Sequence, residues 1–423
     1  MLRVCPTGEQ GTDAASGSRA VEPHGPSGAP ASTELLTGRA VIAAPLIGVL
    51  TLIAALLATN HVGVSFRDTN HVAAKYVVLV GTALIVLVAL DVAIRAAAGT
   101  GSRRPTREAM RAVRRERWGP FRGLAAFAGL LGFYLAYLSY GNIKSVVPLL
   151  RPGVNYDREL QDLDELLFFG ADPTDLAHSL LGAGFQTHVM SVFYVAFIVF
   201  LPLSLALSLV FAKNLRGGLF IATALSANWL IGAATYVAVP ALGPIYAFPE
   251  VFAHLPDTAV TTLQGGLLDD RVAFLANPKD PATGQAIAAF VSLHTSMTVT
   301  AALAAHLLGL GRRLRIALWV VVVVTLIDTI YLGWHYVVDD IGGIAVAVSA
   351  LVVARVLTGI DLRGARRAAG EATAHRSAVA PGPSEAPDRT EAPGPQDAAE
   401  APAHPDRADA EPVGVVPPGR GSG

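Results

Sequence analysis

The sequence predicts an all-α, polytopic membrane protein, a helical bundle of about eight transmembrane helices. Its composition is the first observation: 52% of the 423 residues are hydrophobic and 15% are charged, a balance too apolar for an ordinary soluble domain. The second is a series of apolar runs long enough to cross a bilayer. The third is the position of the basic residues, which fall in alternate loops. Backbone groups inside lipid must be paired within their own segment, so the runs are predicted as helices.

A bilayer core requires about 20 predominantly apolar residues in each helix. Eight runs meet this requirement, and we predict a span at each. They lie near 40–59, 75–97, 121–140, 188–212, 218–240, 286–310, 314–335 and 340–358.

Lys and Arg in short loops indicate the orientation, because such loops stay in the cytoplasm. The loop between the second and third spans is rich in Arg, and basic residues also occupy the loops after the fourth and sixth spans and the region after the last span. With eight spans, all of these segments share one side. We therefore expect a multi-pass protein of the cell membrane, with both termini cytoplasmic.

Composition divides the chain into four parts. Residues 1–36 are rich in Gly, Ser, Ala and Pro, and 359–423 in Ala, Pro and acidic residues; both are predicted to be disordered cytoplasmic tails. Residues 37–117 hold two accessory helices and the basic loop, and 118–358 form the membrane core. The net charge is -1, so no nucleic-acid partner is predicted. The lone Cys5 excludes an intrachain disulfide and a thiolate metal cluster.

Two long segments, 141–187 and 241–285, fall on the outer side and are expected to cap the bundle. In the first, the stretch YDRELQDLDELLFF places Leu160, Leu163 and Leu167 at helical spacing. We expect a helix lying on the membrane surface, with its acidic residues on the face opposite these leucines. A lid packed on the bundle and a role in lipid gating both remain open.

Three polar stretches lie where an apolar run meets the outer face. KSVVPLLRP follows the third span, AFVSLHTSM begins the sixth, and DTIYLGWHYVVDDIGG ends the seventh. The third and seventh spans run outward and the sixth runs inward, so all three stretches reach the same face. Ionisable residues at that depth are costly unless they are paired or functional.

The spacing of His335 and Asp339 puts both side chains on one face of a continuous helix, so the carboxylate can hold one ring nitrogen and leave the other as a nucleophile. A simple capping pair is an equal alternative. His294 lies in a first helical turn, where free N–H groups favour an anion. Ser292 is a candidate N-cap that also bonds a phosphate oxygen, although capping beside a packed histidine is the simpler interpretation.

Lys144 and Arg151 are candidates to clamp phosphate oxygens, the Arg with two parallel hydrogen bonds. Equally, both side chains can extend to lipid headgroups. Asp91, in the second span, and His306, in the sixth, lie away from the outer end and are expected to be structural.

At these residues the chain resembles the type-2 phosphatidic acid phosphatase superfamily. Members carry Lys, six residues and Arg-Pro; then Pro-Ser-Gly-His; then Ser-Arg, five residues, His, three residues and Asp. The first motif is intact here, the second survives as VSLH, and the third keeps its His and Asp, while Asp328 and Thr329 take the places of Ser and Arg. The resemblance covers roughly residues 120–358.

The departures are similar to the inositol phosphorylceramide synthase branch, which tends to show Ser-Leu-His and a run like TIYLGWHYVVD. The resemblance implies a six-helix phosphatidic acid phosphatase-like core and a phosphotransferase acting on lipid phosphates or phosphodiesters. It implies His335 as nucleophile, Asp339 as its partner and His294 as acid and base, with Lys144, Arg151 and Ser292 on the phosphate. The acceptor is then a polyol or lipid hydroxyl, and no metal or other cofactor is expected.

Three alternatives remain. Water in place of the alcohol makes the protein a lipid phosphate phosphatase, and the sequence does not decide between transfer and hydrolysis. An anion transporter is less favoured, because no inverted repeat is evident. A non-catalytic membrane scaffold is suggested only by the long tails.

Overall fold

The computed structural model describes residues 31–68, 72–101, 104–211, 215–364 and 366–367. These residues belong to one compact unit, 1–374. Most of the two predicted tails lies outside the described residues. The helices are α1 (Ala31–His61), α2 (Val72–Thr100), α3 (Arg107–Arg117), α4 (Pro120–Leu150), α5 (Asp157–Leu167), α6 (Pro173–Leu181), α7 (Phe185–Phe211), α8 (Leu215–Ala238), α9 (Pro244–Ala247), the 3-10 helix η2 (Pro249–Phe252), α10 (Ala259–Ala276), α11 (Leu293–Leu307), α12 (Arg312–Tyr331) and α13 (Val337–Thr358).

The chain forms a polytopic helical membrane bundle, as predicted, and no strand occurs among the described residues. Seven described helices are long and apolar enough to cross a membrane, namely α1, α2, α4, α7, α8, α12 and α13. The central one is α8, whose apolar window is 83% buried, and it packs against α1, α4, α7, α11 and α13.

The sixth predicted span differs from the prediction. The run 286–310 becomes helical only at Leu293, and α11 has 15 residues. The preceding residues are extended: Ala289 donates its N–H to the carbonyl of Ala241, and Ser292 donates to that of Asp339. Helix α11 is nevertheless an inner helix of the bundle, packed on α8, α12 and α13. Its polar residues Thr295, Ser296 and Thr300 are fully buried. They face neighbouring helices and not lipid, in which polar groups would lack partners.

Close helix packing supports the N-terminal part of the bundle. At Gly132 of α4, an added Cβ would lie 2.4 Å from the backbone of Ala44 and Pro45 in α1. Only glycine permits this approach, a common device where membrane helices pack. Helix α1 therefore belongs to the bundle that holds the site.

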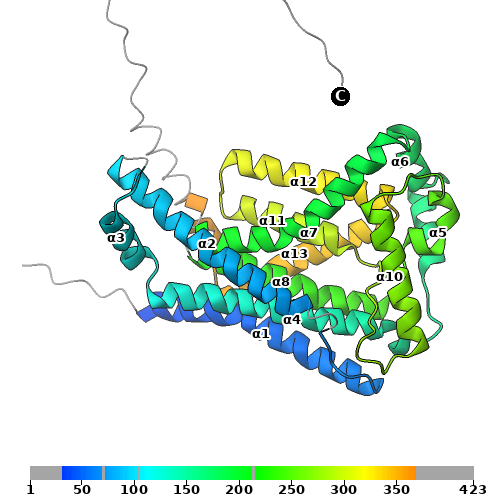
Figure 1. The fold of residues 1–423 in the computed structure, drawn as a ribbon, viewed down its shortest axis with the longest axis horizontal. Coiled ribbons are helices and arrows are strands. Elements are labelled where there is room, and N and C mark those ends of the chain that lie inside the picture. The colour runs from blue at the N-terminus through cyan, green and yellow to red at the C-terminus, as the bar shows by residue number, and fades with distance from the viewer. Residues whose placement is uncertain (1–30, 69–71, 102–103, 212–214, 365, 368–423) are drawn as a thin grey trace, which may run out of the picture. The chain divides into compact units, whose positions relative to one another are not determined.

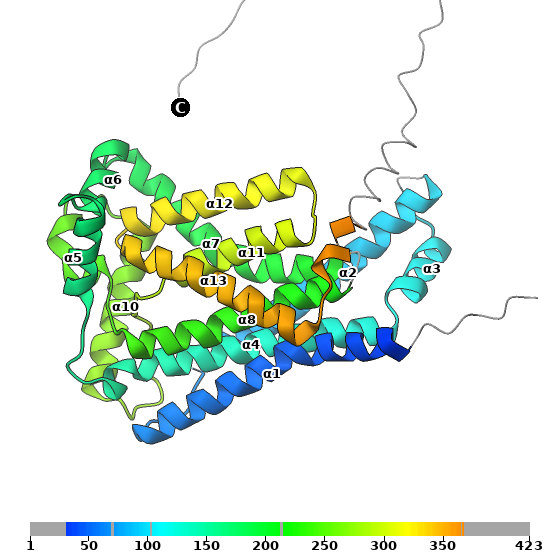
Figure 2. The same ribbon diagram turned by 180° about the vertical axis from the view of Figure 1, so that it is seen from behind.

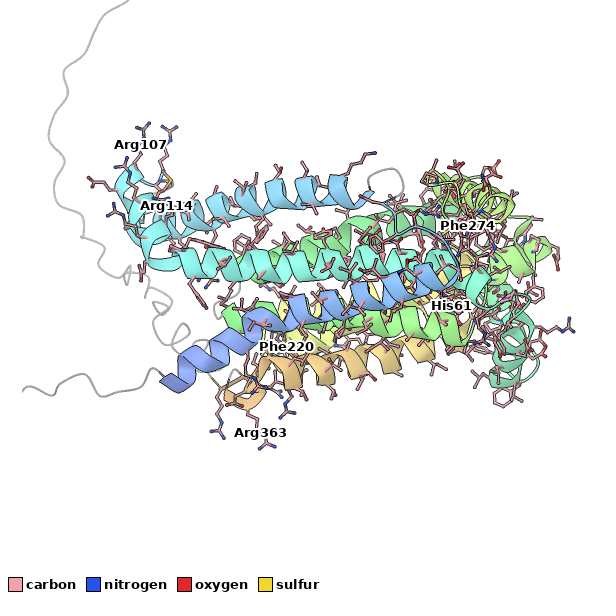
Figure 3. All side chains as sticks on the ribbon, turned by 90° about the horizontal axis from the view of Figure 1, so that it is seen from below. His61, Arg107, Arg114, Phe220, Phe274 and Arg363 are labelled. Atoms are coloured by element: carbon pink, nitrogen blue, oxygen red, sulfur yellow. The ribbon has the colours of Figure 1, made fainter. Side chains whose placement is uncertain are left out.

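The two ends of the bundle differ in charge (Figure 3). Arg107 and Arg114 of α3 gather at one end together with Arg363, whereas His61 and Phe274 lie at the other. At the Arg-rich end, the buried carboxylate of Asp91 pairs with Arg95 and Arg117, each at 2.8 Å. The structural role expected for Asp91 fits this pairing, which joins α2 to the end of α3.

The opposite end carries the extra helices. Figures 1 and 2, which view the bundle from opposite sides, both place α5, α6 and α10 together at the end away from α3. The chain direction alternates from helix to helix. As a result, this end of the bundle holds the ends of α4, α8 and α12 and the beginnings of α11 and α13. All three polar stretches of the sequence therefore reach this end, as the topology predicted.

Candidate active site

His335 lies in the turn between α12 and α13, not at the end of a span as predicted. Helix α12 ends because the carbonyl of Thr329 accepts two N–H groups, from Trp334 at 2.9 Å and from His335 at 3.2 Å. Gly333 has φ +71° in this turn, a left-handed conformation that favours glycine. This turn places the buried imidazole of His335 at the end of the bundle that carries α5, α6 and α10.

His335 and Asp339 are in contact, although by a different route from the predicted one. The Nδ1 atom of His335 lies 3.2 Å from Oδ2 of Asp339, and the same oxygen accepts the backbone N–H of Tyr336 at 3.0 Å. The helix does not continue through both residues. Instead, Asp339 is the third residue of α13 and reaches back over its start. The carboxylate of Asp339 therefore both caps the start of α13 and holds the imidazole of His335.

The imidazoles of His294 and His335 meet. Nδ1 of His294 lies 3.0 Å from Nε2 of His335. Because the carboxylate oxygen of Asp339 is an acceptor, Nδ1 of His335 carries the proton, and Nε2 then holds the lone pair. His294 donates to that lone pair. The rings of Tyr194 and Phe197, whose centroids lie 5.2 and 4.8 Å away, hold the His294 ring in place.

The two histidines line a cavity of about 440 Å³, a size typical of small-molecule sites. Lys144 lines the same cavity and projects its ammonium over the ring of Tyr236, at 5.1 Å from the centroid. Eight of the other lining residues are aromatic. The aromatic lining residues are Tyr137, Tyr140, Tyr194, Phe197, Trp229, Tyr236, Tyr246 and Trp334.

One wall of the cavity depends on the loop after α1. Arg67 lines the cavity and donates to three backbone carbonyls of the segment 278–283, those of Pro278 at 2.8 Å, Asp280 at 2.7 Å and Thr283 at 2.5 Å. Its own backbone exchanges two hydrogen bonds with the side chain of Asn142 in α4. No role was predicted for Arg67, because an arginine that binds distant backbone carbonyls leaves no local pattern in the sequence.

The electrostatics keep His335 neutral. Burial and, to a smaller extent, the positive charge of Lys144 lower its pKa to about 3, against the backbone carbonyl of Ala289, which raises it. A neutral imidazole retains the lone pair that a nucleophile needs. The ring is therefore neutral at physiological pH.

Ser292 and Arg151 do not line the cavity among its described residues. The hydroxyl of Ser292 accepts the N–H of Thr295 at 3.3 Å, so this residue is the predicted N-cap of α11. Arg151 donates to the carbonyl of Val237 at 3.0 Å, at the end of α8. The structure thus brings together His294, His335, Asp339 and Lys144, and leaves Ser292 and Arg151 engaged with backbone.

The prediction for α5 is wrong about its faces. Leu160 is buried, but Leu163 and Leu167 are 47% and 48% exposed, whereas Asp157 and Asp164 are buried. The carboxylates turn inward because they accept backbone N–H groups that would otherwise be unpaired. The prediction rested on the spacing of the hydrophobic residues alone, so it did not anticipate that these carboxylates accept backbone N–H groups.

These two carboxylates hold the turn that carries His335. Asp164 accepts from Val337 at 2.6 Å and from Val338 at 2.9 Å, the first N–H groups of α13. Asp157 accepts the hydroxyl of Tyr336 at 3.0 Å and the N–H of Gly243 at 2.8 Å. The signal in the sequence was two acids seven residues apart, which share one face of a helix.

Thr329 stands at the position where the phosphatidic acid phosphatase motif has Arg, and it lies away from the cavity. Thr329 is fully buried, and its hydroxyl donates to the carbonyl of Thr325 at 2.9 Å. Behind it, Asp340 accepts from Thr295 at 2.5 Å. This small polar network joins α11, α12 and α13 beneath the histidines.

The comparison with protein families agrees with the site. Residues 158–353 match the sequence model of the PAP2 superfamily, the type-2 phosphatidic acid phosphatases. The match includes His294, His335 and Asp339, but it begins after Lys144 and Arg151 in the chain. It supports placing the chain in this superfamily and supports an enzyme with phosphatase-type or phosphotransferase-type activity on lipid phosphates. Comparison with curated proteins and with solved structures gives no significant match.

Proposed function

We propose that this protein is a membrane phosphotransferase that moves a phosphorylated headgroup from a lipid-linked phosphate or phosphodiester to a hydroxyl acceptor. The contact between Nδ1 of His294 and Nε2 of His335 carries the proposal. It pairs a nucleophile, backed by Asp339, with a proton donor in one cavity. The likeness of TIYLGWHYVVD to the inositol phosphorylceramide synthase branch favours transfer.

In the first half-reaction, Nε2 of His335 attacks phosphorus and the bond from phosphorus to the leaving oxygen breaks. The entering phosphate anion replaces the His294–His335 hydrogen bond and stabilises His294 as an imidazolium, which is protonated on both ring nitrogens. Nδ1 of this imidazolium gives its proton to the leaving alkoxide, and His294 becomes neutral. Asp339 holds the proton on the other nitrogen of His335 and stabilises the positive charge that develops on the ring. The product is a phosphohistidine and a free alcohol.

In the second half-reaction, an acceptor hydroxyl attacks the phosphohistidine. His294, now neutral and unprotonated at Nδ1, takes the proton of the hydroxyl. The bond between phosphorus and nitrogen breaks, and His335 recovers its lone pair. A polyol or a lipid hydroxyl gives a new phosphodiester, whereas water gives hydrolysis.

Lys144 is a cation whose charge acts on His335. It shares the cavity wall with both histidines, and its charge already depresses the pKa of His335. We infer that its ammonium stabilises the non-bridging oxygens, on which charge builds in the transition state. Arg151 and Ser292 remain predictions as phosphate ligands, because both bond to backbone.

The orientation follows from charge. Arg107, Arg114 and Arg363 gather at one end of the bundle, and basic residues near spans stay cytoplasmic. We therefore place the histidines at the extracytoplasmic face of the cell membrane and both termini in the cytoplasm. The substrate then enters from the outer leaflet.

The experiment is to trap the covalent intermediate. The full chain is purified in detergent, mixed with a radiolabelled lipid phosphate and quenched in alkali, in which phosphohistidine survives. Label should remain on the wild type, be lost in acid, and be missing from His335→Ala. An anion transporter or a scaffold would give no acid-labile label, and that result would overturn the proposal.

Transfer and hydrolysis are separated by the products. With a lipid phosphodiester as donor and a polyol added, a transferase forms a new phosphodiester in proportion to the polyol. A phosphatase releases inorganic phosphate from a lipid phosphomonoester at a rate that the polyol does not change.

A further inference from the structure

Helix α5 has two opposed faces, one carboxylate-bearing and buried, the other apolar and exposed. The exposed apolar residues lie at its C-terminal half and in the turn that follows. We call them the α5 ridge, which consists of Leu163, Leu166, Leu167, Phe168 and Phe169. Leu166 is 73% exposed and Phe169 fully exposed.

We propose that the α5 ridge is inserted into the outer leaflet, at the boundary between lipid headgroups and acyl chains. This inference is independent of the proposed reaction. It concerns a segment that precedes the spanning helix α7 and does not itself cross the membrane.

The depth of α5 supports this assignment. Asp164 bonds to the N–H of Val337, the first residue of the spanning helix α13. Its neighbour α6 is tied to the end of another spanning helix, because Nε2 of His178 lies 2.8 Å from the carbonyl of Tyr331, the last residue of α12. Both short helices therefore lie at the level where spans end. That level is the membrane interface.

The orientation of α5 is fixed by its buried face. Asp157 and Asp164 are committed to backbone N–H groups and to Tyr336, so the helix cannot roll to hide its leucines. Gln161 adds a hydrogen bond of 2.9 Å to Asp172, the N-cap of α6. The ridge is thus held outward by hydrogen bonds.

Polarity also changes along the helix. Arg158, Glu159 and Asp162 are exposed in the N-terminal half, and the apolar residues follow. A helix that is charged toward one end and apolar toward the other fits a surface that grades from water into lipid. Four consecutive apolar residues exposed to water would be a liability in a soluble cap.

The apolar surface continues toward the lipid-facing spans. Along the chain after the ridge, Leu180 of α6 is 82% exposed and Phe185, the first residue of α7, is 77% exposed. Further down α7, Val192 is 68% exposed, as befits a spanning helix. Lipid is therefore the occupant that covers α7, and the ridge resembles that surface in being apolar and exposed.

Site-directed spin labelling tests the proposal. In a chain with Cys5→Ser, single cysteines are introduced by Leu166→Cys and by Phe169→Cys, labelled with a nitroxide and reconstituted into phosphatidylcholine vesicles. Val192→Cys is the lipid-exposed control and Asp162→Cys the water-exposed control from the same helix. Collision rates with oxygen, which concentrates in lipid, and with a water-soluble nickel chelate are compared.

We expect the labels at positions 166 and 169 to collide more with oxygen than with nickel, like the label at 192. Labels that favour nickel, like the one at 162, would overturn the proposal, because the ridge would then face water. Labels shielded from both reagents would also overturn it, since a second copy or another protein segment would then cover the ridge. The readout does not use turnover, so a failed phosphotransfer assay leaves it intact.

Discussion

The carboxylate of Asp164 accepts a hydrogen bond at 2.6 Å from the backbone N–H of Val337, two residues after His335. This bond joins the cap of the bundle to the turn that carries the candidate nucleophile. Asp164 does not line the cavity, so we expect it to affect catalysis by positioning His335. The consequences can be measured.

We expect Asp164→Asn to lower kcat by about 10- to 100-fold with little change in KM, because small displacements of a reacting group are costly. Asp162→Asn, on the exposed side of the same helix, is the matched control and should behave as wild type. Steady-state kinetics on both variants test this. Equal rates for Asp164→Asn and wild type would show that the turn holds without the carboxylate.

The pH dependence of turnover should report on the same group. Burial, with smaller contributions from the negative charges of Asp339 and Asp172, raises the pKa of Asp164 to about 6, against the N–H groups of Val337 and Val338 that lower it. Below that pH the protonated acid is a poorer acceptor. We expect turnover to rise between about pH 5 and 7, and this rise to flatten in Asp164→Asn. The pKa of His335, about 3, lies below the window.

Stability should depend on pH with the opposite sign. A carboxyl group whose folded-state pKa is raised contributes stability that is full below its unfolded value, near 3.8, and is lost as the pH rises through about 6. In the wild type the part of stability due to Asp164 therefore falls from pH 4 to 7. Thermal unfolding of wild type and Asp164→Asn across this range should differ in slope. Parallel curves would mean that the burial of Asp164 does not shift its titration.

The two histidines should differ in what their loss removes. His335→Ala loses the nucleophile, so both turnover and covalent labelling should disappear. His294→Ala loses the proton donor, and we expect about a 100- to 10,000-fold slower reaction in which a lipid with an acidic leaving group still labels His335. Circular dichroism and unfolding temperature confirm folding. Labelling that requires His294 but survives without His335 would reverse the two roles.

Lys144 and Arg151 should also separate. Lys144→Met removes the ammonium that faces the histidines, and we expect about a 100-fold or larger loss in kcat. Arg151→Met removes the bond to the end of α8, so we expect a lower unfolding temperature with kcat within a few-fold of wild type. If Arg151→Met instead abolishes turnover while stability is unchanged, its predicted role as a phosphate clamp is restored.

Much of this arrangement follows from the sequence. The apolar runs located the seven spanning helices, and chain direction alone brought KSVVPLLRP, VSLH and TIYLGWHYVVD to one end of the bundle. The contact between His294 and His335 was expected because topology constrains it strongly. The start of α11 was missed because an apolar extended segment, 286–292, has the same composition as a helix.

Side-chain partners far apart in sequence were beyond such reasoning. The inward carboxylates of α5 depend on N–H groups that α13 presents, and nothing local to Asp164 indicates them. Arg151 matches a family motif by spacing, yet its bond to Val237 arises from how α4 and α8 end beside each other. Tertiary context, not residue type, decides these cases.

Because the family match begins only at residue 158, it invites shortening the chain to a core that begins at α4, but the bonds of Arg67 argue against this truncation. A chain begun at Pro120 would retain both imidazoles and Lys144, yet the backbone carbonyls of residues 278–283 would lose the guanidinium that gathers them. That stretch would be free to fold over or away from the histidines. We therefore expect α1 and the loop after it to be part of the minimal working unit.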